Sequence, residues 1–104
     1  MKIKTYEKYS LPDIKKYTVI KYKNNTEDID EYYIDIISNI TKDVIFYNIE
    51  YMYNEKNKNL EQQEKIYAQT AITHYLKMIL FTSDDLNECL EFLKTFTTAN
   101  KYNL

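Results

Sequence analysis

The densest group of chemically capable side chains lies in the second quarter of the chain. Five carboxylates and two phenols fall within nine residues there: Glu27, Asp28, Asp30, Glu31, Tyr32, Tyr33 and Asp35. A carboxylate-only Mg²⁺ or Ca²⁺ site is conceivable, but the segment lacks the glycine and the distal glutamate of an EF-hand loop. Acidic side chains beside tyrosine favour a surface that docks on a basic partner, because tyrosine is large, stiff and amphipathic. We therefore predict that these seven residues bind a protein partner; the alternative is a solvated loop and strand whose tyrosines reflect codon usage.

Few other residues are suited to catalysis or metal binding. His74 is the only histidine and Cys89 the only cysteine, so neither a CxxC nor an HxxxH pair can form. We expect His74 on a helix surface or partly buried, and Cys89 as a core thiol on an apolar helical stripe. Asp84 and Asp85 lie at a helix start, where capping accounts for them. The sequence thus predicts a protein that is not an enzyme and binds no cofactor or metal.

The composition excludes further classes of site. The chain has neither glycine nor arginine, whereas phosphate-binding loops need glycine, and arginine is the side chain best suited to reading phosphates and guanines. The codons of an AT-rich genome explain this skew. Turns must then use asparagine and aspartate, which tolerate a left-handed backbone, and Asn24-Asn25 is the expected hairpin turn.

Charge is unevenly distributed along the chain. Residues 1–25 hold seven lysines against Glu7 and Asp13, whereas residues 26–54 hold seven acids against Lys42. A basic segment can steer a protein to nucleic acid. Here it is short and acids follow it, so direct binding of nucleic acid is not favoured. The opening residues lack the apolar region of a signal peptide, and no run reaches roughly 18 apolar residues, which predicts a cytoplasmic protein without a membrane partner.

The residue pattern predicts an α+β fold, with residues 1–104 forming a single domain. Strands are expected at 17–23, 31–38 and 44–53, which are rich in β-branched and aromatic residues. The middle strand has an alternative, a helix over 26–40 with an apolar face formed by Ile29, Tyr33, Ile36, Ile37 and Ile40. The last strand is expected to place on one face Ile45, Tyr47, Ile49, Tyr51 and Tyr53.

The second half of the chain predicts a helical hairpin. Residues 60–81 contain good helix formers and no breaker, and 84–97 carry an apolar stripe at helical spacing. The expected architecture is therefore a small antiparallel meander packed on this hairpin. The aromatic content also provides material for a homodimer.

The opening segment carries a resemblance. Met1-Lys-Ile-Lys-Thr-Tyr-Glu-Lys-Tyr-Ser-Leu-Pro-Asp13 resembles the start of small phage and prophage accessory proteins from low-GC Gram-positive bacteria, staphylococci especially. It covers 13 of the 104 residues, and no site residue can be carried over from it. The resemblance implies a mobile-element context, in which small proteins often inhibit host machinery stoichiometrically. Anti-CRISPR proteins are one such class.

The expected function is that of a non-enzymatic phage- or mobile-element-type protein that binds and blocks a host protein. Its most specific form is an anti-CRISPR inhibitor of a nucleic-acid-binding effector. Two alternatives stay open. One is a small DNA-binding phage regulator that uses the basic N-terminus, and the other is an immunity or antitoxin protein.

Overall fold

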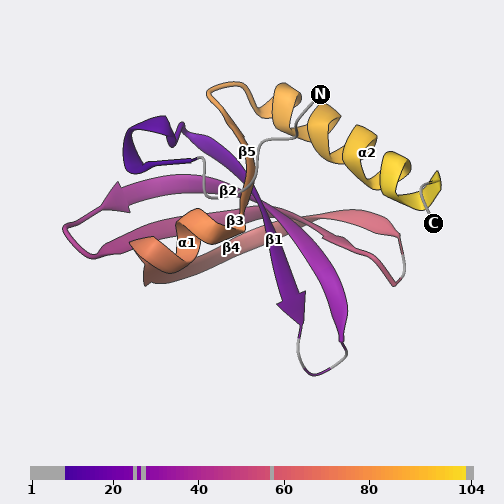
Figure 1. The fold of residues 1–104 in the computed structure, drawn as a ribbon, viewed down its shortest axis with the longest axis horizontal. Coiled ribbons are helices and arrows are strands. Elements are labelled where there is room, and N and C mark those ends of the chain that lie inside the picture. The colour runs from indigo at the N-terminus through magenta and orange to yellow at the C-terminus, as the bar shows by residue number, and fades with distance from the viewer. Residues whose placement is uncertain (1–8, 25, 27, 57, 103–104) are drawn as a thin grey trace.

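The protein has an α+β fold built on one antiparallel sheet (Figure 1). The structure is a computed structural model that describes residues 9–24, 26, 28–56 and 58–102. Five strands lie in the order β4-β3-β2-β1-β5. In chain order the elements are a short 3₁₀ turn η2 (Leu11–Asp13), β1 (Tyr17–Asn24), β2 (Ile29–Ile40), β3 (Val44–Asn54), β4 (Asn59–Ala71), α1 (Ile72–Met78), β5 (Ile79–Ser83) and α2 (Leu86–Tyr102).

The predicted α+β class and the antiparallel meander are confirmed. The strands expected at 17–23, 31–38 and 44–53 correspond to β1, β2 and β3. Segment 26–40 is therefore a strand over most of its length and not the alternative helix. Its central position, between β1 and β3, explains why β-branched and aromatic residues occupy both of its faces.

The helix predicted at 60–81 is wrong. This segment forms a strand (β4), a helix of seven residues (α1) and a second strand (β5). Its good helix formers are overridden because β4 pairs with β3 from Asn59 to Ala71 and satisfies backbone groups that β3 would otherwise leave without a partner. A C-terminal helix does form where 84–97 predicted one, as α2, and it is the longest helix in the described part of the chain.

Capping by Asp85 accounts for the start of α2, as expected, whereas Asp84 does not cap the helix: its Oδ1 accepts from the backbone N–H of Lys16 at 3.2 Å. The backbone N–H of Asn87 donates to the Asp85 carboxylate at 2.9 Å, and the N–H of Asp85 donates to the Ser83 hydroxyl at 3.0 Å. No helix within the described ranges is long and apolar enough to cross a lipid bilayer.

Each face of the sheet packs against one helix. On one face, α2 covers a core cluster made of Val19, Tyr32, Ile34, Cys89 and Leu93. On the other face, α1 covers a second cluster made of Ile20, Ile45, Tyr47, Tyr75 and Ile79. The neighbours Val19 and Ile20 serve different clusters because successive side chains of a strand point to opposite faces.

The prediction that the five odd-numbered apolar residues of β3 share one face is wrong, because β3 contains a bulge. Asp35 of β2 pairs with Ile49, but its neighbour Ile34 pairs with Tyr51, so Glu50 is an extra residue in β3. The bulge reverses the facing of every residue after it. Ile45, Tyr47 and Ile49 accordingly pack on the α1 side, whereas Tyr51 and Tyr53 pack on the α2 side.

Left-handed turns occur without glycine. Asp28, between β1 and β2, has φ 55°, and Lys58, between β3 and β4, has φ 54°. Aspartate at Asp28 agrees with the expectation that asparagine and aspartate make such turns, but Lys58 and Lys65 (φ 50°) do not, since lysine adopts the left-handed backbone there. Asn25 of the predicted Asn24-Asn25 turn lies outside the described residues.

Candidate functional site

The predicted partner-binding residues gather around the turn end of the β1–β2 hairpin, but they divide between its two faces and the core. Glu27 lies outside the described residues. Asp28 and Asp30 occupy one face, and Glu31 and Tyr33 lie on the other. Tyr32 and Asp35 are fully buried, and Glu31 is also buried, at 9% exposed.

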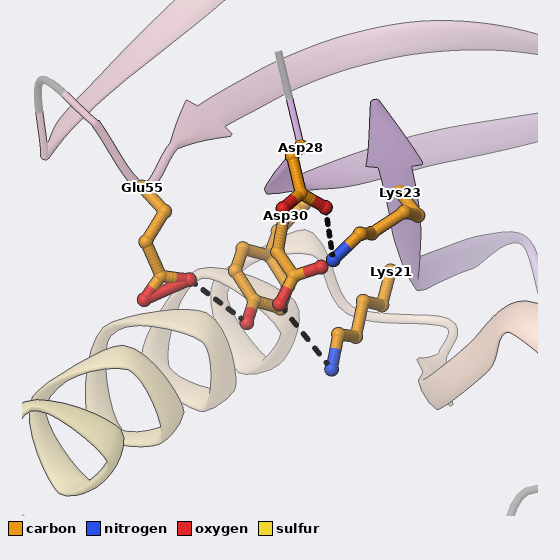
Figure 2. A network of polar contacts seen from close by, with 6 residues as sticks. Lys21, Lys23, Asp28, Asp30 and Glu55 are labelled. Atoms are coloured by element: carbon orange, nitrogen blue, oxygen red, sulfur yellow. Dashed lines mark hydrogen bonds and ion pairs between the residues drawn. The ribbon is translucent and has the colours of Figure 1, made fainter. Parts of the chain in front are cut away.

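The first face is a set of cross-strand ion pairs. Lys23 Nζ lies 3.1 Å from Asp28 Oδ1, and Lys21 Nζ lies 3.5 Å from Asp30 Oδ2 (Figure 2). The hydrogen bond from Lys23 to Asp28 and the charge of that carboxylate raise the pKa of Lys23. The Asp28 side chain remains 85% exposed. This face therefore presents carboxylates to solvent, with each of the two lysines held beside an acid.

The second face carries a stacked tyrosine pair. The rings of Tyr22 and Tyr33 lie 5.8 Å apart at an interplanar angle of 19°. The Tyr33 hydroxyl donates to Glu31 Oε1 at 3.0 Å, and Asn54 Nδ2 donates to Glu31 Oε2 at 3.3 Å. Burial, followed by the hydrogen bond to Glu31, raises the pKa of the Tyr33 phenol. Tyr22, which sequence reasoning did not select, is thus a large exposed ring with a fixed support beneath it.

Tyr32 belongs to the core and not to the surface, which corrects its predicted role. It is 1% exposed, and its ring packs against Tyr53 at 6.1 Å and Phe96 at 5.7 Å between centroids. Its hydroxyl reaches Glu55 Oε2 at 3.3 Å. The adjacent residues Tyr32 and Tyr33 point to opposite faces, so only Tyr33 can take part in the candidate surface.

Asp35 is likewise removed from the candidate surface because its side chain is fully buried. The Tyr75 hydroxyl donates to Asp35 Oδ2 at 2.7 Å, and Oδ1 has no hydrogen-bond partner among the described residues. Burial raises the pKa of this carboxyl well above its ordinary value, against the opposing effect of the bond from Tyr75. Burial raises the pKa of Tyr47 and of Tyr75, and the nearby Asp35 carboxyl contributes a smaller effect in the same direction.

An open groove that sequence reasoning missed lies between α2 and the β3–β4 hairpin. Its volume is about 510 Å³. Apolar side chains line it together with polar ones at its rim: Tyr53, Lys58, Leu60, Leu90, Glu91, Leu93, Lys94, Thr97 and Thr98. The mistaken helix at 60–81 hid this groove, because only a strand at 59–71 brings Leu60 beside α2.

The two residues with reactive side chains lie as the sequence predicted. His74 is exposed on α1. Cys89 is fully buried in the cluster under α2, and its burial, with a smaller effect of the nearby acids, raises the pKa of the thiol to about 12. Over the described ranges, no group of three or more His, Cys, Asp or Glu side chains is placed to hold a metal ion.

Cys89 provides a direct probe of the α2 core. We expect its reaction with a water-soluble disulfide reagent at pH 8 to be at least about 100-fold slower in the folded protein than in urea, because a buried thiol reacts only after local opening. The rate of thiol release is measured by absorbance. Equal rates with and without urea would contradict the packing of α2 on the sheet.

The candidate surface is therefore the turn end of the β1–β2 hairpin, with Asp28 and Asp30 on one face and Tyr22 and Tyr33 on the other, where the buried Glu31 accepts a hydrogen bond from Tyr33. The sheet that supports it is buried on both sides close to this end. Side chains held in this way can bind a partner without first being ordered. Comparison of the chain with protein-family models, with curated proteins and with solved structures found no match.

Proposed function

We propose that this chain is a non-enzymatic phage- or mobile-element-type protein that binds a host protein and blocks it. Its most specific form is an anti-CRISPR inhibitor that occupies the nucleic-acid-binding surface of an effector in the host-cell cytoplasm. The observation that carries the proposal is that the turn end of one hairpin holds the Asp28 and Asp30 carboxylates on one face and the supported Tyr22 ring on the other.

The two kinds of side chain have complementary roles in this proposal. The carboxylates of Asp28 and Asp30 approach basic side chains that otherwise contact phosphates, so binding competes with nucleic acid. Tyr22, held by the Tyr33 ring, contributes buried area at the partner surface with little loss of rotamer freedom.

The ion pairs favour a protein partner over DNA. In the alternative of a DNA-binding regulator, lysines of the basic N-terminus would contact phosphates, and Lys21 and Lys23 are two of its seven lysines. Each of these two lysines lies within 3.5 Å of an aspartate carboxylate, whose charge repels a phosphate at the same place. A regulator of this kind would bind duplex DNA with an affinity that falls steeply with salt, which a gel shift would detect.

The test is inhibition of DNA cleavage by purified Cas9-type effectors of low-GC Gram-positive bacteria. We expect the wild-type protein to inhibit at least one of them, and Asp28→Lys with Asp30→Lys to weaken inhibition about tenfold or more, since each close charge pair contributes about 1 kcal/mol or more. The double variant should fold normally, because the ion pairs that it removes are exposed and worth at most about 1 kcal/mol each.

A matched control is Glu61→Lys with Glu64→Lys on β4, which makes the same change of net charge away from the hairpin end. Both glutamates are exposed. Equal loss of inhibition in the two double variants would reduce the effect to net charge alone and would contradict the proposed surface. Absence of inhibition across the effectors would remove the anti-CRISPR form of the proposal.

A further inference from the structure

The outer edge of β4 is open for strand pairing. β4 is the terminal strand of the sheet, and among the described residues it pairs on one side only, with β3 (Figure 1). Three of the six exposed large apolar residues of the described chain lie on it, namely Leu60, Ile66 and Tyr67. Tyr67 is 73% exposed, the highest value in that group. Unpaired strand edges with exposed apolar side chains are typical sites of association.

The ladder with β3 defines which backbone groups face outward. The N–H of Ile72 donates to the carbonyl of Asp43 at 3.0 Å, and the register from there runs without interruption from Val44↔Ala71 to Ile49↔Ile66. Hydrogen-bonded and non-hydrogen-bonded pairs alternate along an antiparallel ladder. The N–H and C=O groups of Tyr67 and Gln69 and the N–H of Ala71 therefore point away from β3, whereas the C=O of Ala71, the N-cap of α1, accepts the first hydrogen bond of that helix.

Segment 66–71 has none of the usual protection of an edge strand. Its sequence is Ile-Tyr-Ala-Gln-Thr-Ala, without charge or proline. The devices that block edge pairing, a charged side chain and a distorted backbone, occur together one residue earlier at Lys65, which has φ 50°. The unprotected stretch is thus bounded by Lys65 on one side and by the start of α1 on the other.

We propose that segment 66–71 pairs antiparallel with the same segment of a second copy of this chain, with the two-fold axis at Gln69. In this register Tyr67 lies opposite Ala71 of the second copy, the N–H of Ala71 donates to the C=O of Tyr67, and the N–H and C=O of Gln69 pair with those of Gln69 in the second copy. The large Tyr67 ring faces the methyl group of alanine in the second copy, so it has room to lie across the interface between the two strands. No charged residue faces a like charge, because the paired segment carries none.

This pairing extends the five-stranded sheet through both copies and forms a reversible dimer. Six-residue strands bury less area than a standard stable interface, so we expect a dissociation constant on the order of 10–100 µM. Two other strands, β3 and β2, separate β4 from β1, so the end of the β1–β2 hairpin stays outside the joint. The dimer is therefore independent of the proposed function.

Sedimentation equilibrium of the full chain, over roughly 1–500 µM, tests the proposal. The wild-type protein should pass from monomer to dimer within this range. Gln69→Lys places two lysines opposite each other at the axis and should raise the dissociation constant at least about tenfold. Gln62→Lys is the matched control, an identical change on β4 beyond Lys65, and should leave the constant within about twofold of the wild-type value.

A charge exchange tests the register itself. Gln69→Lys and Gln69→Glu should each be largely monomeric alone, and an equimolar mixture should recover the dimer, because only the Gln69-centred register brings residue 69 of both copies together. A wild-type protein that stays monomeric at 500 µM would overturn the proposal, as would a dimer that Gln69→Lys leaves intact. If the monomer lost affinity for an effector on Gln69→Lys, the edge would belong to that partner, which also overturns self-pairing.

Discussion

Asp35→Asn is expected to raise the free energy of unfolding at pH 8 relative to that of the wild-type protein. Asp35 is 0% exposed, and burial raises the pKa of its carboxyl well above the ordinary value. An amide of the same shape carries no proton to lose and can still accept the hydrogen bond from Tyr75. The wild-type carboxyl loses its proton in the unfolded chain at this pH, whereas the folded chain keeps the carboxyl protonated in the core, and this difference favours unfolding. The substitution removes that contribution.

The sign of the pH dependence follows from the raised pKa. Below the ordinary aspartate pKa of about 3.9, the carboxyl is protonated in both states and adds no pH dependence. As the pH rises above this value, the unfolded chain releases the proton while the folded chain retains it. The free energy of unfolding therefore falls with rising pH until the pH reaches the raised pKa of the folded state.

Urea unfolding at a series of pH values between roughly 4 and 9 measures this difference. The two curves should converge at the acid end and separate as the pH rises, with the Asp35→Asn protein the more stable. Asp43→Asn serves as control, since Asp43 is exposed and should show no such separation. Parallel curves for wild type and Asp35→Asn would show that the carboxyl is not held protonated in the core.

Tyr32→Ala is expected to lower the free energy of unfolding by about 3–5 kcal/mol. The ring lies between β2 and α2 against Tyr53 and Phe96, so truncation leaves a cavity where the helix meets the sheet. Tyr22→Ala should cost only about 1 kcal/mol, because Tyr22 is 41% exposed and contributes mainly the stacking contact with Tyr33. Denaturant unfolding followed by circular dichroism measures both.

Tyr22→Ala and a further variant, Tyr32→Phe, separate a binding tyrosine from a core tyrosine. Tyr22→Ala should weaken inhibition of the effector with little change in stability, whereas Tyr32→Phe should keep both stability and inhibition close to wild type. A stable Tyr32→Ala protein that fails to bind would contradict the placement of Tyr32 in the core and would restore its predicted role as a contact residue.

The sequence pattern predicted β1 to β3 because their alternation and their β-branched and aromatic content agree with the pairing that they adopt. Segment 60–81 misled because Gln62, Glu64 and Lys65 favour a helix locally, while the long ladder with β3 decides the structure. Because a single helix was predicted through Ala71, the change from β4 to α1 at this residue was also missed. Pairing between segments far apart in the chain carries no local signal that residue propensity can detect.

The candidate surface was predicted only in part, because its composition depends on contacts between segments far apart in the chain. Composition located the hairpin end, and Asp28, Asp30, Glu31 and Tyr33 lie there. It did not separate Tyr33 from Tyr32, because which neighbour faces the core depends on where α2 packs. Asp35 was taken as a surface acid because it alternates with apolar residues in the chain. Tyr22 was missed because its role comes from stacking across the strands.

Hydrogen exchange of the chain, alone and bound to an inhibited effector, tests the proposed binding surface most directly. The account predicts that binding slows exchange in the β1–β2 hairpin end, over residues 21–33, and leaves α2 and the β4 edge unchanged. Protection confined to α2 or to residues 66–71, with the hairpin end unaffected, would contradict it.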